Sequence, residues 1–267
     1  MQVIIQPDAE AAACLAARLV ARAIRAKPHL VLGLATGRTM ERVYEELVRF
    51  HREEGLDFSH CHTFNLDEFV GLGPDDPHSF RRFMETRLFS KVNLDSRNIH
   101  FLNGLAQDLH AECEAYERQI RTCGGIDLQL LGIGVDGHIG FNEPLSALMS
   151  RTREKALTPA TIRQYAPFFG SPRRVPKRGI TMGVGTILES RTCLLLATGE
   201  EKAKVVARAV EGPMTAMISA SALQLHPSCC VVVDEAAAAE LVEKDYYRWI
   251  FQNEPEWAEF RQLGRRA

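Results

Sequence analysis

The chain lacks any long apolar run and any marked excess of one charge. No stretch of its 267 residues approaches the roughly 18 apolar residues that a membrane-spanning helix needs. Its 32 basic and 34 acidic residues are interspersed, with a net charge of -2, so no basic surface for nucleic acid is indicated. The first residues show neither the basic nor the apolar segment of a signal peptide. We therefore expect no membrane contact, no nucleic-acid partner and a cytoplasmic location.

Paired cysteine spacing is also lacking. The seven cysteines are an odd number and are scattered without a repeating frame, which is typical of reduced thiols in a cytosolic protein. His60-Cys61-His62, and His226 with Cys229-Cys230, invite a zinc interpretation, but the paired Cys-x-x-Cys frame of a structural zinc site is missing. No Gly/Ser-rich linker, low-complexity tract or internal repeat divides the chain, so we expect one domain over residues 1–267.

What the sequence does contain is an alternation of apolar strands with helices of regular apolar spacing. This pattern predicts an α/β fold with a mostly parallel sheet covered on both faces. Expected strands cover residues 3–5, 29–34, 62–66, 99–102, 128–133, 179–184, 192–197 and 229–233. Expected helices cover 9–26, 39–53, 79–88, 109–122 and 200–210. Residues 146–178 carry four prolines and few strong patterns, and we expect them to form a flap.

Three strand-to-helix turns carry residues suited to chemistry. In a parallel sheet such turns lie at the carboxyl edge, where ligands bind. The first runs from Gly33 to Thr39, and its small residues open a helix whose free N–H groups and positive dipole end suit a phosphate. Thr36, Thr39 and Arg38 would add side-chain contacts. The alternative is an ordinary N-cap followed by an exposed arginine.

The second turn places Asp67 and Glu68 at the end of an apolar strand. Two adjacent carboxylates there are costly to desolvate unless they are used or paired. The alternative is an N-cap aspartate beside a solvated glutamate.

The third turn runs from Gly132 to Pro144. Residues 132–137 fit Gly-x-Gly-x-x-Gly, but glycine and proline follow where a helix should start, so we reject a nucleotide site. His138 is flanked by Asp136 and Glu143, and a carboxylate beside imidazole raises its basicity for general acid–base catalysis. The alternatives are a metal site formed by these three residues and a histidine with a purely structural role.

Together these segments resemble the glucosamine-6-phosphate deaminase family (glucosamine/galactosamine-6-phosphate isomerases). The similarity keeps the family's order from about residue 1 to 235 and is most specific in Asp136–Pro144. Thr63–Leu72, Ile180–Thr186 and Leu223–Pro227 also match. The resemblance implies an open, Rossmann-like three-layer sandwich and an enzyme that converts glucosamine 6-phosphate into fructose 6-phosphate and ammonia. It implies an amino-sugar phosphate as substrate and no cofactor or metal, and it allows a homo-oligomer.

The resemblance also implies a role for each candidate residue. His138, held by Asp136 and Glu143, would move a proton at the ring oxygen, and Asp67 would carry a proton from C2 to C1, with Glu68 in support. Residues implied at the substrate and its phosphate are Thr36, Gly37, Arg38, Thr39, Gly137 and Lys202.

The chain departs from the family at two places. Pro167 stands where the family usually has an arginine, and we hypothesise that Arg38 supplies the missing cation. Some hexameric members are activated by N-acetylglucosamine 6-phosphate, and their site is matched by Ser146, Arg153 and Lys155. Ala156 replaces a threonine of that site, so we do not expect activation.

Two other functions compete with a deaminase. One is a related sugar-phosphate lactonase or isomerase, but lactone hydrolysis needs no C2 proton transfer and hence no Asp67. The other is a non-catalytic sugar-phosphate sensor, which would usually carry a DNA-binding helix pair at one end. The choice between the gluco and galacto epimers stays open.

Overall fold

The computed structural model describes residues 1–263, so residues 264–267 of the expected domain lie outside the described part. Its centre is a seven-stranded sheet of order β1-β10-β9-β6-β2-β3-β5, in which every neighbouring pair is parallel. The strands are β1 (Gln2–Gln6), β2 (Val31–Leu34), β3 (His62–Asn65), β5 (Ile99–His100), β6 (Leu128–Leu131), β9 (Thr192–Ala197) and β10 (Cys229–Asp234). The predicted parallel α/β sheet is confirmed.

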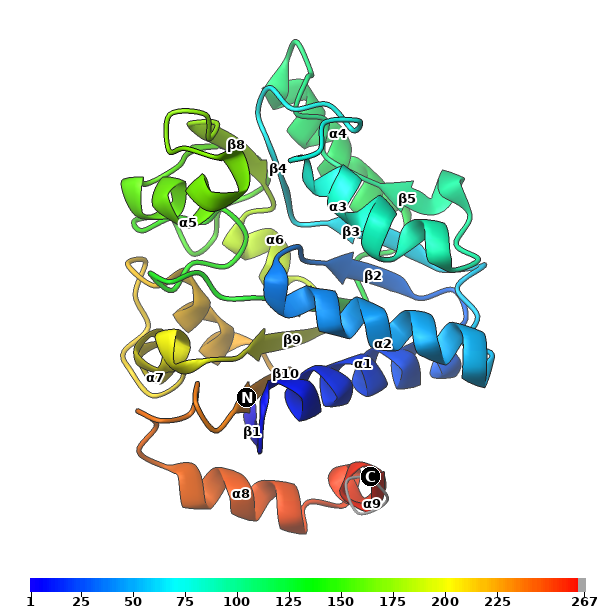
Figure 1. The fold of residues 1–267 in the computed structure, drawn as a ribbon, viewed down its shortest axis with the longest axis vertical. Helices are drawn as coiled ribbons and strands as arrows, with labels where there is room; N and C mark the ends of the chain where they lie inside the picture. The colour runs from blue at the N-terminus through cyan, green and yellow to red at the C-terminus, as the bar shows by residue number, and fades with distance from the viewer. Residues whose placement is uncertain (264–267) are drawn as a thin grey trace.

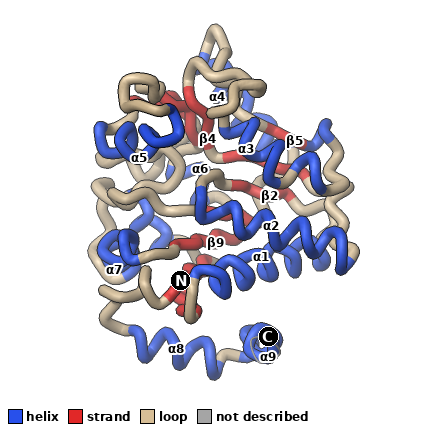
Figure 2. Tube along the Cα trace, viewed as in Figure 1, coloured by secondary structure: helices blue, strands red, loops and turns tan. Residues whose placement is uncertain are grey.

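Helices cover both faces of this sheet. Crossovers between parallel strands are right-handed, which assigns α1, α2 and α3 to one face and α4, α6 and α7 to the other. Figure 1 shows α1 and α2 nearest the viewer with α4 and α6 behind, and Figure 2 shows α1 and α2 lying across the strands. Apart from one helix within residues 146–178, the α-helices are α1 (Ala9–Ala26), α2 (Arg38–Glu54), α3 (Phe80–Arg87), α4 (Leu109–Thr122), α6 (Val184–Leu188), α7 (Ala203–Val210), α8 (Lys244–Asn253) and α9 (Ala258–Leu263). Short 3-10 helices cover Phe89–Lys91, Ser96–Asn98, Glu200–Lys202, Ser219–Leu225 and Pro255–Trp257.

Local sequence fixes where the long helices begin and end. Asp8 caps α1 by accepting a hydrogen bond from the N–H of Ala11, and Gly55 ends α2 in the left-handed conformation. The apolar faces of these helices pack on the sheet in one core, in which Leu32, Val43 and Leu130 are almost fully buried. Burying each such side chain contributes about 1.5–3 kcal/mol. Within residues 1–263 no helix has the length and apolar character to cross a bilayer.

A second, antiparallel sheet of order β4-β8-β7 lies beside the parallel one and was not predicted. It consists of β4 (Asp67–Phe69), β7 (Arg153–Ala156) and β8 (Arg178–Thr181). The strand expected at 179–184 belongs to this small sheet, and its predicted end was wrong because Val184 already begins α6. Residues 153–156 were missed because Arg-Glu-Lys-Ala has no apolar alternation to mark a strand.

The expected flap at 146–178 contains β7 and a helix, α5 (Pro159–Phe169). Phe169 and Leu157 from this segment pack with Phe69, Phe80 and Phe141 in a second apolar cluster, separate from the main core. Aromatic packing therefore anchors α5 beside β4 (Figure 1).

The chain reverses its direction across the sheet between β2 and β6. From β2 it proceeds outward through β3 to β5, then returns to β6 beside β2 and proceeds through β9 to β10 on the other side. The loops after β2 and β6 consequently diverge and leave a crevice at the carboxyl edge, the usual ligand site in such sheets. The loops that carry Thr36, Asp67 and His138 all leave the sheet at this edge.

Candidate active site

A cleft of about 540 Å³ opens at the carboxyl edge of the parallel sheet. Its walls come from the loops after β2, β3, β6 and β9, from the end of β10 and from α5. The sequence-predicted residues that line it are Thr36, Gly37, Arg38, Thr39, Asp67, His138 and Lys202. Asp136, Gly137 and Glu143 do not line it. The three turns singled out in the sequence therefore meet in one cleft.

The N-terminus of α2 forms one wall. Gly37 precedes the helix with φ of 112°, a conformation that residues with a Cβ rarely adopt, and no side chain caps the helix. The N–H groups of Arg38 and Thr39, the first two of this 17-residue helix, are thus left for a ligand, with the positive end of the helix dipole behind them, whereas the N–H of Met40 bonds to the carbonyl of Gly37. Backbone N–H groups so arranged favour a phosphate, and Arg38 and Thr39 line the cleft beside them.

Lys202, after β9, adds a second cation to this wall. Burial, helped by the charge of Arg38, holds the pKa of Lys202 below its usual value although the carboxylates of Glu201 and Asp136 raise it. Arg42 also lines the cleft and was missed in the sequence. It lies one helical turn after Arg38, and that i,i+4 spacing places both on the same side of α2.

Asp67 begins β4 with a side chain that is almost fully buried. Burial, and then the negative charge of Glu68, raise the pKa of Asp67 well above the ordinary aspartate value. No hydrogen bond from within residues 1–263 reaches its carboxylate. A carboxylate whose pKa lies closer to neutral pH is a stronger base, which suits Asp67 to abstract a proton from a substrate carbon.

His138 lies in the loop after β6 with its ring 6% exposed. Its Nδ1 is 2.6 Å from Oδ1 of Asp136 and 3.6 Å from Oε2 of Glu143. Neither contact has the geometry of a hydrogen bond, and Nδ1 has no other hydrogen-bond partner among the described residues. Burial favours neutral Asp136, but the contact with His138 outweighs it and holds the pKa of Asp136 below its usual value. With Nδ1 facing the two carboxylates, Nε2 is the nitrogen left for a substrate.

Two glycines make this arrangement possible. A Cβ on Gly134 would lie 2.3 Å from the His138 ring, so only glycine leaves room for the imidazole. A Cβ on Gly140 would lie 2.8 Å from the hydroxyl of Thr181 and 3.6 Å from Oδ2 of Asp67. The histidine loop therefore passes directly beside Asp67.

Glu143 links the histidine loop to α5. Its buried carboxylate accepts hydrogen bonds from the N–H of Thr158 at 2.9 Å and from the hydroxyl of Thr158 at 3.1 Å. Thr158 is also the N-cap of α5, because its hydroxyl accepts from the N–H of Thr161. Thr158 was not predicted as a site residue because α5 itself was not expected.

The helix α5 contributes Gln164 and Tyr165 to the cleft, both missed for the same reason. The side-chain oxygen of Gln164 is buried and accepts no hydrogen bond from the described residues. Pro167 lies near the end of α5, three residues after Gln164. Arg153 and Lys155 lie on β7 and do not line the cleft.

A metal ion is a second possible occupant of the histidine loop, because the ligand atoms of Asp136, His138 and Glu143 all lie within 4.8 Å of one another. The same arrangement is also that of an imidazole oriented by two carboxylates, and such an arrangement needs no ion. The zinc interpretation of His226 finds no support, because its Nε2 contacts the carbonyl of Ser190 at 2.7 Å and its Nδ1 accepts from the N–H of Ser228.

Known proteins are similar to this chain in sequence and in fold. The family model of glucosamine-6-phosphate isomerases/6-phosphogluconolactonase matches residues 7–233. The glucosamine-6-phosphate deaminase of Arthrobacter sp. is 48% identical over 257 residues, 96% of this chain and 99% of the relative. Glucosamine-6-phosphate deaminase 2 of Giardia intestinalis is 54% identical over 233 residues, 87% of this chain and 89% of the relative.

Solved structures agree. A monomeric glucosamine-6-phosphate deaminase has a TM-score of 0.88 at 43% identity, covering 90% of this chain and 100% of that one. The 6-phosphogluconolactonase of Leishmania guyanensis has a TM-score of 0.71 at 21% identity, covering 90% and 98%, and so shares the fold. The chain belongs to the glucosamine-6-phosphate isomerase/6-phosphogluconolactonase family.

Proposed function

We propose that the protein is a glucosamine-6-phosphate deaminase that isomerises the amino sugar and releases ammonia. The observation that carries this proposal is the shared cleft of Asp67 and His138, with the N-terminus of α2 on a neighbouring wall. The relatives described above, named as deaminases at about half identity over nearly the whole chain, support the same activity.

Substrate binding begins with the phosphate. The free N–H groups of α2, together with Arg38, Thr39 and Lys202, form its site. Gly137 lies away from this cleft, and its N–H bonds to the carbonyl of Gly134, so its part in our proposal is to shape the turn before His138.

Ring opening is the first chemical step. His138 accepts the proton of the C1 hydroxyl and returns it to the ring oxygen, so the C1–O5 bond breaks and the C1 aldehyde forms. Asp136 and Glu143 stabilise the imidazolium that exists between the two transfers.

Isomerisation and loss of ammonia follow. Asp67 removes the C2 proton while O1 gains a proton, which gives an enediol-like intermediate, and Asp67 then returns its proton to C1. The amine nitrogen loses one proton in the same conversion, so an imine is left at C2. Water adds to C2 and ammonia departs, so glucosamine 6-phosphate and water become fructose 6-phosphate and ammonia.

Asp67 separates this proposal from a lactonase. Lactone hydrolysis abstracts no carbon-bound proton, whereas this chain holds a buried carboxylate of raised pKa in the cleft. The test is to incubate the protein with glucosamine 6-phosphate, its galacto epimer and 6-phosphogluconolactone in turn. Equimolar ammonia and ketose phosphate from an amino sugar support the proposal. The rates with the gluco and galacto epimers give the substrate specificity of the enzyme. Hydrolysis of the lactone alone would overturn it.

The seven cysteines are all free in the structure, six of them with raised thiol pKa values caused by burial. Reduced thiols of this kind fit a reducing compartment, and we include a cytoplasmic location in the proposal.

A further inference from the structure

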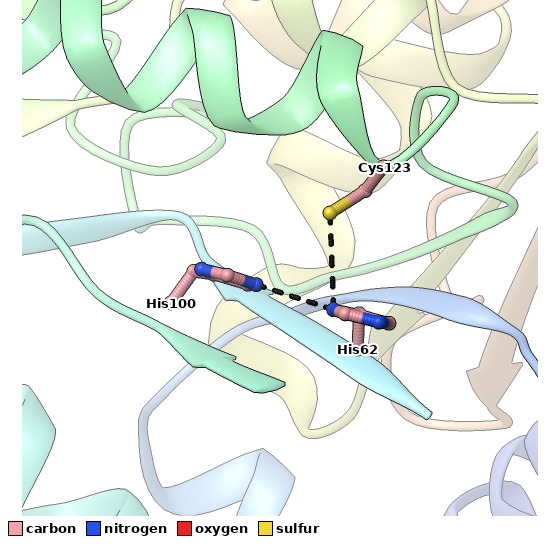
Figure 3. Close-up of side chains that lie close together, drawn as sticks. All are labelled: His62, His100 and Cys123. Atoms are coloured by element: carbon pink, nitrogen blue, oxygen red, sulfur yellow. Dashed lines mark hydrogen bonds between the residues drawn. The ribbon is translucent and has the colours of Figure 1, made fainter. Parts of the chain in front are cut away.

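A cluster of two histidines and one cysteine lies apart from the cleft, at the β3–β5 side of the sheet. His62 comes from β3, His100 from β5, and Cys123 from the residue that ends α4 (Figure 3). Nδ1 of His62 is 3.3 Å from Nε2 of His100 and 3.8 Å from Sγ of Cys123. The two imidazole planes are within 6° of parallel. None of the three residues lines the cleft or enters the proposed reaction.

The two distances from Nδ1 of His62 are close to those between the ligand atoms of a tetrahedral zinc ion. Zinc bonds of about 2.0 Å to nitrogen and 2.3 Å to sulfur separate neighbouring ligand atoms by about 3.3 to 3.6 Å. The three ligand atoms lie within 4.8 Å of one another, and a rotation of the Cys123 side chain would have to bring its sulfur closer to the two nitrogens. Two imidazoles and a thiolate are a donor set that borderline-soft ions prefer.

The surroundings hold the ligands in place and leave the site reachable. The Phe64 ring stacks on His100 at 4.3 Å, which fixes the imidazole plane. All three ligands are half-buried rather than enclosed, so an ion has access and water can occupy the fourth position. The cluster is not the zinc pattern that the sequence suggests at His60-Cys61-His62, because Cys61 is buried and its thiol donates to the carbonyl of Pro28.

We propose that His62, His100 and Cys123 bind one zinc-class divalent ion. On binding, the Cys123 thiol loses its proton to solvent and a Zn–S bond forms, while each imidazole gives the ion a nitrogen lone pair. The ion joins the end of α4 to β3 and β5. His62 is the first residue of β3, so the site lies at the amino end of this strand and stabilises the β3–β5 side of the sheet there.

Cobalt is the sharpest probe, because a thiolate on Co²⁺ gives a near-ultraviolet charge-transfer band, and the Asp136, His138 and Glu143 cluster has no thiol. The purified, metal-stripped protein is titrated with Co²⁺ and then with Zn²⁺. We expect one equivalent to produce the band and Zn²⁺ to abolish it. Cys123→Ser and His62→Gln should lose the band and weaken zinc binding by about tenfold or more. Zinc should also raise the Tm of the wild type but not of either variant.

Cys14→Ser is the matched control, since Cys14 is also half-buried but lies near Glu46 and no histidine of the cluster. It should keep both the band and the zinc affinity. Absence of the band in the wild type, or its persistence in Cys123→Ser, would overturn the proposal. If zinc binds without any cobalt band, and if that zinc binding is lost in Asp136→Asn, the ion lies at the catalytic histidine instead.

Discussion

Asp67 and Glu68 are neighbours on β4, yet their carboxylates have opposite surroundings. Asp67 lines the cleft, whereas Glu68 accepts hydrogen bonds from the N–H groups of Phe69, Phe80 and Arg81. Burial raises the pKa of Glu68 to about 7 in spite of these bonds, and its charge in turn helps raise the pKa of Asp67. Glu68 thus anchors α3 and also tunes the base beside it.

The first prediction concerns Glu68→Gln. Asp67 acts as a base only when deprotonated, so activity is lost as the pH falls through its raised pKa. Removing the like charge of Glu68 lowers that pKa, and the acid limb of kcat/KM should shift to lower pH. The measurement is a pH–rate profile of both proteins, with Glu85→Gln as control, because Glu85 is a half-buried carboxylate of α3 that does not line the cleft. An acid limb that shifts upward would contradict this tuning.

The second prediction concerns the bond between Thr158 and Glu143. Thr158→Val removes the hydroxyl that donates to Glu143 and caps α5, a neutral-to-charged hydrogen bond of about 1.5–3 kcal/mol. We expect kcat to fall about tenfold, because Glu143 then holds His138 less firmly. Thr158→Ser keeps the hydroxyl and should restore most of the rate. If Val and Ser behave alike, the hydroxyl does not support the histidine.

The third prediction tests whether Arg38 replaces the cation absent at Pro167. Loss of a charged contact to phosphate costs about 1.5–3 kcal/mol, so Arg38→Ala should raise KM by about 10- to 100-fold with a smaller change in kcat. Arg52→Ala, an exposed change near the other end of α2, is the control. Steady-state kinetics with an unchanged KM would reject this role for Arg38.

The fourth prediction concerns Gln164, which lines the cleft and whose buried side-chain oxygen has no hydrogen-bond partner among the described residues. A hydroxyl of the sugar would satisfy this oxygen. Gln164→Leu should therefore lower kcat/KM by about five- to tenfold, the worth of one neutral hydrogen bond. The exposed neighbour Arg163, changed to Leu, should have no such effect. Equal losses in both variants would indicate a general disturbance of α5.

The sequence predicts an element correctly where its local apolar pattern matches the burial of that element in the fold. Four-residue apolar strands such as β2 and β6 are buried on both faces, so their composition alone predicts a parallel sheet, and the turns after them follow. The small sheet was missed because β7 is polar and its pairing with β8 depends on residues distant in sequence. Gln164, Tyr165 and Thr158 escaped notice because their positions depend on α5, which is anchored by aromatic contacts with β4 and not by a periodic pattern of its own.

The central claim is that Asp67 moves the proton between C2 and C1, and Asp67→Asn tests it most directly. The variant keeps the size of the side chain but cannot act as a base. We predict that it binds glucosamine 6-phosphate within about threefold of the wild type, while kcat falls by about 100-fold or more, the range of a lost general base. A variant that binds the sugar and still releases ammonia at the wild-type rate would contradict the account.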